Sequence, residues 1–190
     1  MIRYSLIGLF CIHLAMLPAA AQTQVRQFTV TIEGAGTGSY TQTFKENPRT
    51  GVVELTCTST VRIKKFVVKY NYDITATECW RNGIMCHADC TRNDNGDVLQ
   101  FHAADQVWTS SYHELPHADW SKLPVLDMDT NTVRLCQLRC VGKDQFGMHY
   151  QLTGGLQADL WYDAQGRLCR RVMMRKGRLT TLALVGVSNS

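Results

Sequence analysis

The sequence lacks several patterns, and each absence argues against a class of protein. No window keeps a 3.6-residue apolar period over ten residues, which argues against a helical fold. The chain has no Gly-rich phosphate loop, serine nucleophile elbow, paired-carboxylate motif or C-x-x-C redox motif. It shows no low-complexity segment and no sign of a domain boundary. The sequence therefore predicts one globular domain with no recognisable catalytic residue and no cofactor.

The charge balance is also weak. The chain has 20 Lys and Arg residues against 16 Asp and Glu residues, and they are spread along its length. Nucleic-acid-binding domains carry a strong basic patch on one face, so we expect no nucleic-acid partner.

A long apolar run occurs only near the N-terminus. Residues 6–17 are apolar apart from His13, and Ala19 and Ala21 satisfy the A-x-A rule for signal-peptide cleavage. The run is shorter than the roughly 20 apolar residues that a membrane-spanning helix needs. We therefore predict a signal peptide at residues 1–21 and a mature domain at residues 22–190. This domain would be exported, periplasmic or secreted, with no stable membrane span.

The predicted mature domain has an odd number of cysteines, in a compartment that permits disulfides. Cys86 and Cys90 would share one face of a strand, as would Cys136 and Cys140. If these strands were antiparallel neighbours, Cys86–Cys140 and Cys90–Cys136 could form two disulfides. Residues four apart on a strand are about 13 Å apart, too far to share one zinc ion. The alternative is that these cysteines are small buried hydrophobic residues.

Alternation of apolar and polar residues dominates the rest of the chain, and Asn82-Gly83 fits a type I′ hairpin turn. We predict an all-β antiparallel meander of about ten strands with one long loop. A sheet this wide should curl into a barrel or half-barrel, because strands twist and the apolar face must be buried. The predicted strands cover Phe28–Ile32, Ser39–Phe44, Val52–Ile63, Phe66–Thr77, Ile84–Arg92, Val98–Ala103, Val133–Val141, Met148–Leu152, Gln157–Tyr162, Leu168–Met174 and Leu179–Val185.

The alternation breaks between Ala104 and Pro124, and a connection this long is unusual in a compact domain. One interpretation is a lid or binding loop. The other, which we favour, is a plug whose aromatic side chains seal one end of the sheet.

The same loop contains His113-Glu-Leu-Pro-His117, a literal match to H-E-x-x-H. In zinc proteases this motif works because both histidines lie on one face of a helix. Pro116 disfavours that helix, so the protease geometry is not expected. A looser metal site formed by His113, His117 and Asp119 stays open as an alternative.

The C-terminal segment Leu152-Thr-Gly-Gly-Leu-Gln-Ala-Asp-Leu-Trp-Tyr-Asp-Ala-Gln-Gly-Arg-Leu168 resembles the signature of an uncharacterised family of exported bacterial β-rich proteins, a domain of unknown function. Glu78-Cys-Trp-Arg-Asn-Gly83 and Ser110-Ser-Tyr112 also resemble segments of that family. His113 departs from it, since a tryptophan is expected there. The resemblance implies a β-rich envelope protein and brings no activity.

These observations predict a non-catalytic, β-barrel-like module that binds an apolar or amphiphilic ligand such as a lipid. A carrier of this kind needs a continuous cavity of roughly several hundred Å³. The alternatives are a structural or interaction protein with a filled core, and a metal-dependent hydrolase that uses His113 and His117. The oligomeric state stays open. The inward-facing aromatic residues are expected to be Phe66, Tyr70, Tyr72, Trp80, Trp108 and Trp161, and the candidate ligand-binding residues are Trp108, Tyr112, His113, Trp120 and Trp161.

Overall fold

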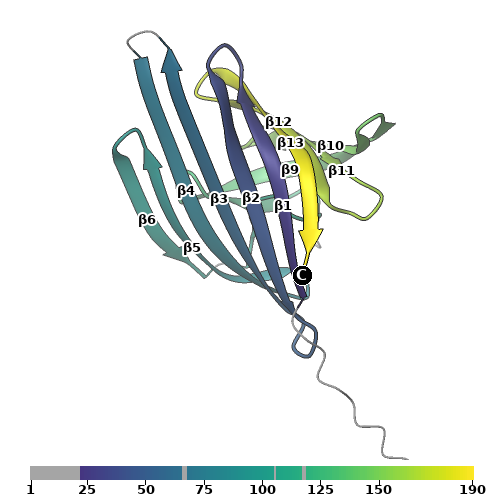
Figure 1. The fold of residues 1–190 in the computed structure, drawn as a ribbon. Coiled ribbons are helices and arrows are strands. Elements are labelled where there is room, and N and C mark those ends of the chain that lie inside the picture. The colour runs from purple at the N-terminus through teal and green to yellow at the C-terminus, as the bar shows by residue number, and fades with distance from the viewer. Residues whose placement is uncertain (1–21, 66–67, 105, 117–118) are drawn as a thin grey trace, which may run out of the picture.

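A single wide β-sheet is formed by the residues that the structure, a computed structural model, describes: 22–65, 68–104, 106–116 and 119–190 (Figure 1). The predicted signal peptide, Phe66 and His117 lie outside these residues. All the regular secondary structure within the described ranges is β-strand. None of these residues forms a helix long and apolar enough to cross a membrane.

The sheet has thirteen strands in the order β6-β5-β4-β3-β2-β1-β13-β12-β11-β10-β9-β8-β7. Two hairpin meanders, β1 to β6 and β8 to β13, are joined by the pairing of β1 with β13. All pairs are antiparallel except β7 with β8. The strands are β1 (Gln22–Ile32), β2 (Gly36–Asn47), β3 (Val52–Lys65), β4 (Val68–Arg81), β5 (Ile84–Asp94), β6 (Asp97–Ala103), β7 (Trp108–Thr109), β8 (Leu123–Asp127), β9 (Thr132–Asp144), β10 (Gly147–Gly154), β11 (Ala158–Tyr162), β12 (Leu168–Arg175) and β13 (Arg178–Asn189).

The predicted all-β antiparallel fold is confirmed, although the sheet has more strands than expected. The sequence did not predict β7 and β8. Pro124 hides β8, because proline weakens a strand pattern. β7 pairs only with Val125 and Leu126, so Pro124 lies on a part of β8 that β7 does not cover.

The sheet curls into an open half-barrel (Figure 1). Bulges interrupt the register at Gln27/Phe28, Cys79/Trp80, His149/Tyr150 and Trp161/Tyr162, and a bulge bends a strand and increases its twist. No strand pairing between β6 and β7 closes the sheet within the described residues. The turn between β4 and β5 is left-handed at both positions, with φ of 52° at Asn82 and 73° at Gly83, which confirms the predicted type I′ hairpin.

The concave face of the half-barrel carries the core. Alternate residues of each long strand point inward, as Leu55, Cys57 and Val61 do on β3. Among the buried polar side chains of the long strands, Gln42 on β2 and Glu78 on β4 are fully buried. These two residues mark the place where another part of the chain enters the half-barrel.

The predicted disulfides are wrong. β5 lies between β4 and β6, and β9 lies between β8 and β10, so the two strands are not neighbours. The seven cysteines of the described residues are free. Cys86 and Cys90 do not share a face either, since Cys86 is exposed and Cys90 is buried. The bulge between β4 and β5 adds one residue to β5 and breaks the alternation there.

Candidate functional site

The segment Trp108–Glu114, which we call the plug, lies inside the half-barrel. Its side chains are buried at most positions, with exposed fractions of 4% for Trp108, 0% for Tyr112 and 4% for His113. A lid would lie over the surface and stay accessible. The segment therefore fills the concave face, as the favoured interpretation of the long loop predicts.

Five consecutive plug carbonyls accept hydrogen bonds from side chains. Four of the donors come from β1, β2, β11 and β12, and thus from both meanders. Buried carbonyl groups need such partners, so the sheet fixes both the depth and the path of the plug. The pairs are Arg171 Nη1 to Ser110 O at 3.1 Å, Gln42 Nε2 to Ser111 O at 3.2 Å, Tyr162 Oη to Tyr112 O at 3.0 Å, Arg26 Nη1 to His113 O at 3.2 Å and Trp108 Nε1 to Glu114 O at 3.0 Å.

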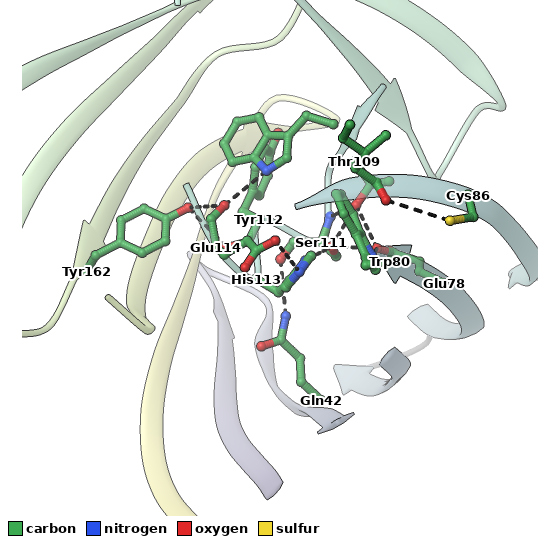
Figure 2. A network of polar contacts seen from close by, with 12 residues as sticks. Gln42, Glu78, Trp80, Cys86, Thr109, Ser111, Tyr112, His113, Glu114 and Tyr162 are labelled. Atoms are coloured by element: carbon green, nitrogen blue, oxygen red, sulfur yellow. Dashed lines mark hydrogen bonds and ion pairs between the residues drawn. The ribbon is translucent and has the colours of Figure 1, made fainter. Parts of the chain in front are cut away.

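Glu78 anchors the plug to β4 (Figure 2). Its Oε2 accepts hydrogen bonds from Trp80 Nε1 at 2.9 Å, Thr109 Oγ1 at 3.0 Å and Ser111 Oγ at 3.1 Å. Its Oε1 is buried and has no hydrogen-bond partner. Burial raises the pKa of Glu78 above its ordinary value, while His113 and the three donors act in the opposite direction. Glu78 is therefore a buried carboxyl group whose charged form is disfavoured.

His113 lies beside this cluster, toward the end of the half-barrel where Asn189 and Ser190 lie; we call this the lower end. Its Nδ1 is 3.4 Å from Ser111 Oγ, its Nε2 is 3.3 Å from Glu114 Oε1, and its ring packs edge-on against Trp80. A serine nucleophile must give its proton to the base. Ser111 Oγ instead donates to Glu78 Oε2 at 3.1 Å and lies 2.6 Å from Thr109 Oγ1. The hydroxyl groups thus hold the plug in place, and the geometry does not favour an activated serine.

A narrow cavity with a volume of about 80 Å³ remains above the plug. It is smaller than an apolar cavity of about 150 Å³ that holds benzene. It also falls well short of the volume expected for a lipid carrier. Apolar side chains from four strands and from the segment after β8 line it: Val30, Ile32, Val61, Ile74, Met128 and Leu182.

Arg171 also lines this cavity, and it lacks an acidic partner. Its Nη1 donates to Ser110 O, its guanidinium carbon lies 5.6 Å from the centre of the Tyr112 ring, and its buried Nε has no partner. Among the described residues no carboxylate lies within ion-pairing distance of it. Arg175, on the same strand, pairs with Asp129 at 2.8 Å. The cavity thus carries a guanidinium group without an ion-pair partner, while Glu78 and the Asp129–Arg175 pair also contribute to its lining.

A second hollow lies on the other side of the plug and has a volume of about 970 Å³. Arg26, Phe44, Trp80 and His113 contribute to its wall, together with the turn between β4 and β5. Burial, with a smaller contribution from Arg167, lowers the pKa of Arg26 to about 10. Ser110 and Ser111 line the smaller cavity, whereas His113 and Glu114 border the larger hollow, so the plug lies between the two.

Comparison with known proteins assigns this chain to a family. The family described as Domain of unknown function (DUF6134) matches residues 28–185. The chain belongs to the DUF6134 family. This result confirms the resemblance to an uncharacterised β-rich family.

A solved structure shares the fold of this DUF6134 domain. It is described as the crystal structure of a beta-barrel-like protein of domain of unknown function DUF1849 from Brucella abortus. The similarity has a TM-score of 0.57 and covers 88% of this chain and 98% of that chain, at 8% sequence identity. An identity this low shows a shared fold alone. No curated protein matches the chain.

The DUF6134 structure gives a partial view of the predicted metal site. His117 lies outside the described residues, so the set of His113, His117 and Asp119 stays a prediction. His113 is buried, whereas Asp119 is exposed and accepts hydrogen bonds from the backbone and side chain of Ser121. No group of three metal-ligating side chains is found within the described ranges.

The predicted aromatic ligand-binding residues divide into three groups. Trp108, Tyr112 and His113 belong to the plug, and of these His113 also borders the lower hollow. Trp120 is half-buried, and its Nε1 donates to Pro116 O at 3.1 Å. Trp161 forms the third group, because it lies on the convex face. The other aromatic residues expected to face inward behave as predicted where they are described: Tyr70 and Tyr72 line the narrow cavity, and Trp80 is buried beside the plug.

Trp161 does not face the interior, so that prediction is wrong. Its neighbours on β11, Leu160 and Tyr162, are buried, and the Tyr162 hydroxyl reaches the plug. Alternation then places Trp161 on the convex face. There its ring stacks on His149 at 4.4 Å and its Nε1 donates to Asp144 at 2.8 Å.

Three residues that position the plug or line the cavity of the DUF6134 domain were not predicted from the sequence: Gln42, Glu78 and Arg171. A signal was present for the first two. Gln42 and Glu78 occupy inward positions of otherwise apolar alternation, and a buried polar residue in a strand implies a polar partner. Nothing in the sequence identifies that partner, because the plug is separated from β2 and β4 along the chain.

The raised pKa of Glu78 predicts a pH dependence of stability. In the folded state the pKa of Glu78 lies above its ordinary value of 4.5, so the folded state holds this proton more tightly than the unfolded state does. The resulting stabilisation is present below the unfolded pKa and is lost as pH rises through the folded pKa. Glu78→Gln cannot titrate. The stability of the wild type relative to Glu78→Gln is therefore expected to fall as pH rises from about 4.5 through the folded pKa of Glu78.

Urea unfolding of both proteins across this pH range measures the difference. A wild-type advantage that grows with pH would mean that the pKa of Glu78 is lowered in the folded protein, and would contradict this assignment.

Proposed function

We propose that this DUF6134 domain is an exported, non-catalytic module that binds a slender anionic amphiphile. The acidic group would pair with Arg171, and the apolar part would lie along the narrow cavity. Export rests on the signal peptide predicted at residues 1–21. The observation that carries the proposal is that Arg171 lines the cavity without an ion-pair partner among the described residues.

The charge argument is physical. A guanidinium group that is partly removed from water without a counter-ion costs free energy. A carboxylate would supply that counter-ion and would accept charge-assisted hydrogen bonds, including one from the unpartnered Nε. Arg175 offers no equivalent site, because Asp129 already neutralises it.

The size of the cavity restricts the ligand. A volume of about 80 Å³ cannot enclose a lipid with two acyl chains. A single unbranched chain is the apolar shape that best matches a narrow space between packed strands. The rest of such a ligand would extend past Ile32 on β1 and Tyr70 on β4, which also line the cavity.

A filled-core structural or interaction protein is the second candidate. The buried side chains of the plug favour it, because they occupy most of the concave face. On this alternative, Arg171 serves only to hold the Ser110 carbonyl. The two candidates differ in whether Arg171 binds an added anion.

Decanoate distinguishes them. In isothermal titration calorimetry with residues 22–190, we expect decanoate to bind and decanol, which has the same chain without the charge, to bind at least about tenfold more weakly. Arg171→Gln should weaken decanoate binding by at least about tenfold. Arg178→Gln, an exposed substitution next to the β12–β13 turn, should leave binding unchanged. Absence of decanoate binding, or equal binding by the wild type and Arg171→Gln, would favour the filled core.

A further inference from the structure

The β4–β5 hairpin carries two cysteines on the convex face, opposite the plug. Glu78 and Trp80 point inward, so alternation turns Cys79 outward. In the strand register Cys79 pairs with His87 and Trp80 pairs with Met85. Cys86 falls between these two pairs and is the extra residue of a β-bulge.

The bulge brings Cys86 next to Cys79. At a bulge two residues of one strand lie opposite a single residue of its partner, so Cys86 and His87 both lie opposite Cys79. The pKa of Cys79 is raised by partial burial and by the neighbouring Cys86 thiol. Cys86 is exposed and Cys79 is partly exposed. Opposed residues of antiparallel strands have Cα atoms about 4.5–5.5 Å apart, within the range that a disulfide spans.

We propose that Cys79 and Cys86 form a redox-active dithiol that a disulfide-bearing oxidant converts into an intramolecular disulfide. The more exposed Cys86 loses its proton, and its thiolate attacks one sulfur of the oxidant. One half of the oxidant leaves as a thiolate. Cys79 then loses its proton and attacks Cys86 Sγ, and the second half of the oxidant leaves. Two electrons pass from the cysteine pair to the oxidant, which is released as two thiols.

The other cysteines of the described residues do not offer this arrangement. Cys57, Cys90 and Cys136 are buried, and burial raises the pKa of each thiol. Cys140 is exposed, but it lies on β9, far from β5 in the sheet order. Cys169 lies on β12, where its thiol contacts the carbonyl oxygens of residues 146 and 161.

The location gives the disulfide a structural consequence. Trp80, Asn82 and Gly83 lie beyond the Cys79–Cys86 pair at the end of the hairpin, and they line the wide lower hollow. A covalent bond across the bulge would tie β4 to β5 directly beside this wall. It would also fix the backbone on both sides of Cys79, where Glu78 and Trp80 meet the plug.

Peptide mapping tests the proposal on residues 22–190, reduced, desalted and then incubated with oxidised glutathione. Trypsin separates Cys79 in peptide 70–81 from Cys86 in peptide 82–92. We expect these peptides to be joined, with the loss of two hydrogen atoms relative to their summed mass. Peptide 82–92 also contains Cys90, so the mapping is repeated with Cys90→Ala, which should retain the link.

Two variants complete the design. Cys79→Ser should abolish the link and leave Cys86 as a mixed disulfide with glutathione. Cys140→Ser, which removes another exposed thiol, should leave the link unchanged. The proposal is overturned if the wild type shows Cys79 and Cys86 free, separately glutathionylated, or joined to other cysteines. The wild-type map decides this even if a variant fails to fold.

Discussion

Replacing Glu78 with alanine is expected to lower the free energy of unfolding by about 3–4 kcal/mol. Three buried donors, from Trp80, Thr109 and Ser111, share its Oε2. Removing the acceptor leaves the indole N–H buried without a partner. It also leaves a void between β4 and the plug, which further lowers stability. Lost hydrogen bonds and lost packing therefore act in the same direction.

Urea unfolding followed by tryptophan fluorescence measures this loss. Glu54→Ala is the matched control, because Glu54 lies on the neighbouring strand, pairs with Cys79 and faces solvent. A surface substitution of this kind should change stability by less than about 0.5 kcal/mol. If Glu78→Ala were as stable as the control, Glu78 would not anchor the plug.

The anchoring role of Glu78 also explains why the cavity is narrow. The plug is held by Glu78 on β4 and by carbonyl contacts to β1, β2, β11 and β12, so it cannot move as a free lid. The two candidate functions therefore share one structural basis. A well-fixed plug leaves a small, defined cavity, and the charge of Arg171 decides whether that cavity is a binding site or only a packing gap.

Local patterns in the sequence predict much of this fold. Alternation on β1, β3 and β11 predicts strands because residues two apart share a face of the sheet. Asn82-Gly83 predicts a type I′ turn because both positions need positive φ, and the observed angles agree. These predictions hold because each depends on residues that are close together in the chain.

Contacts between distant segments could not be predicted in the same way. The pairing of β1 with β13 decides that β5 and β9 are not neighbours in the sheet, and it rules out the predicted disulfides. The bulge at Cys86 reverses which face that residue occupies, so a strict two-residue period fails there. Trp161 was misplaced because a tryptophan can be buried on the convex face when His149 covers its ring. Each miss arises from register or long-range pairing.

Tyr112 is the largest fully buried side chain of the plug, and Tyr112→Ala is expected to lower the free energy of unfolding by about 4 kcal/mol. The side chain is fully buried, and its ring packs edge-on against Trp108 at 5.1 Å. Alanine would leave an unfilled space of nearly a whole ring. For a domain of this size, the melting temperature should fall by roughly 12 °C.

Tyr112→Phe separates the ring from the hydroxyl group. The hydroxyl is buried and has no hydrogen-bond partner, so its removal relieves an unsatisfied polar group. We expect Tyr112→Phe to range from no change to a gain of about 1 kcal/mol. A loss as large as that of Tyr112→Ala would instead show that the hydroxyl makes an essential contact, and would contradict the packing explanation.

The variant Tyr112→Ala also connects packing to binding, because the Tyr112 ring lies beside the Arg171 guanidinium. Removing the ring opens space on the side of the cavity where the acidic group of a ligand is proposed to bind. An acid with a bulky end, such as 4-phenylbutyrate, should therefore raise the melting temperature of Tyr112→Ala more than that of the wild type. Equal shifts in the two proteins would mean that the acid does not enter this space. The double variant Tyr112→Ala/Arg171→Gln should lose the extra shift, because the cavity would remain while the charge that recognises the carboxylate would be gone.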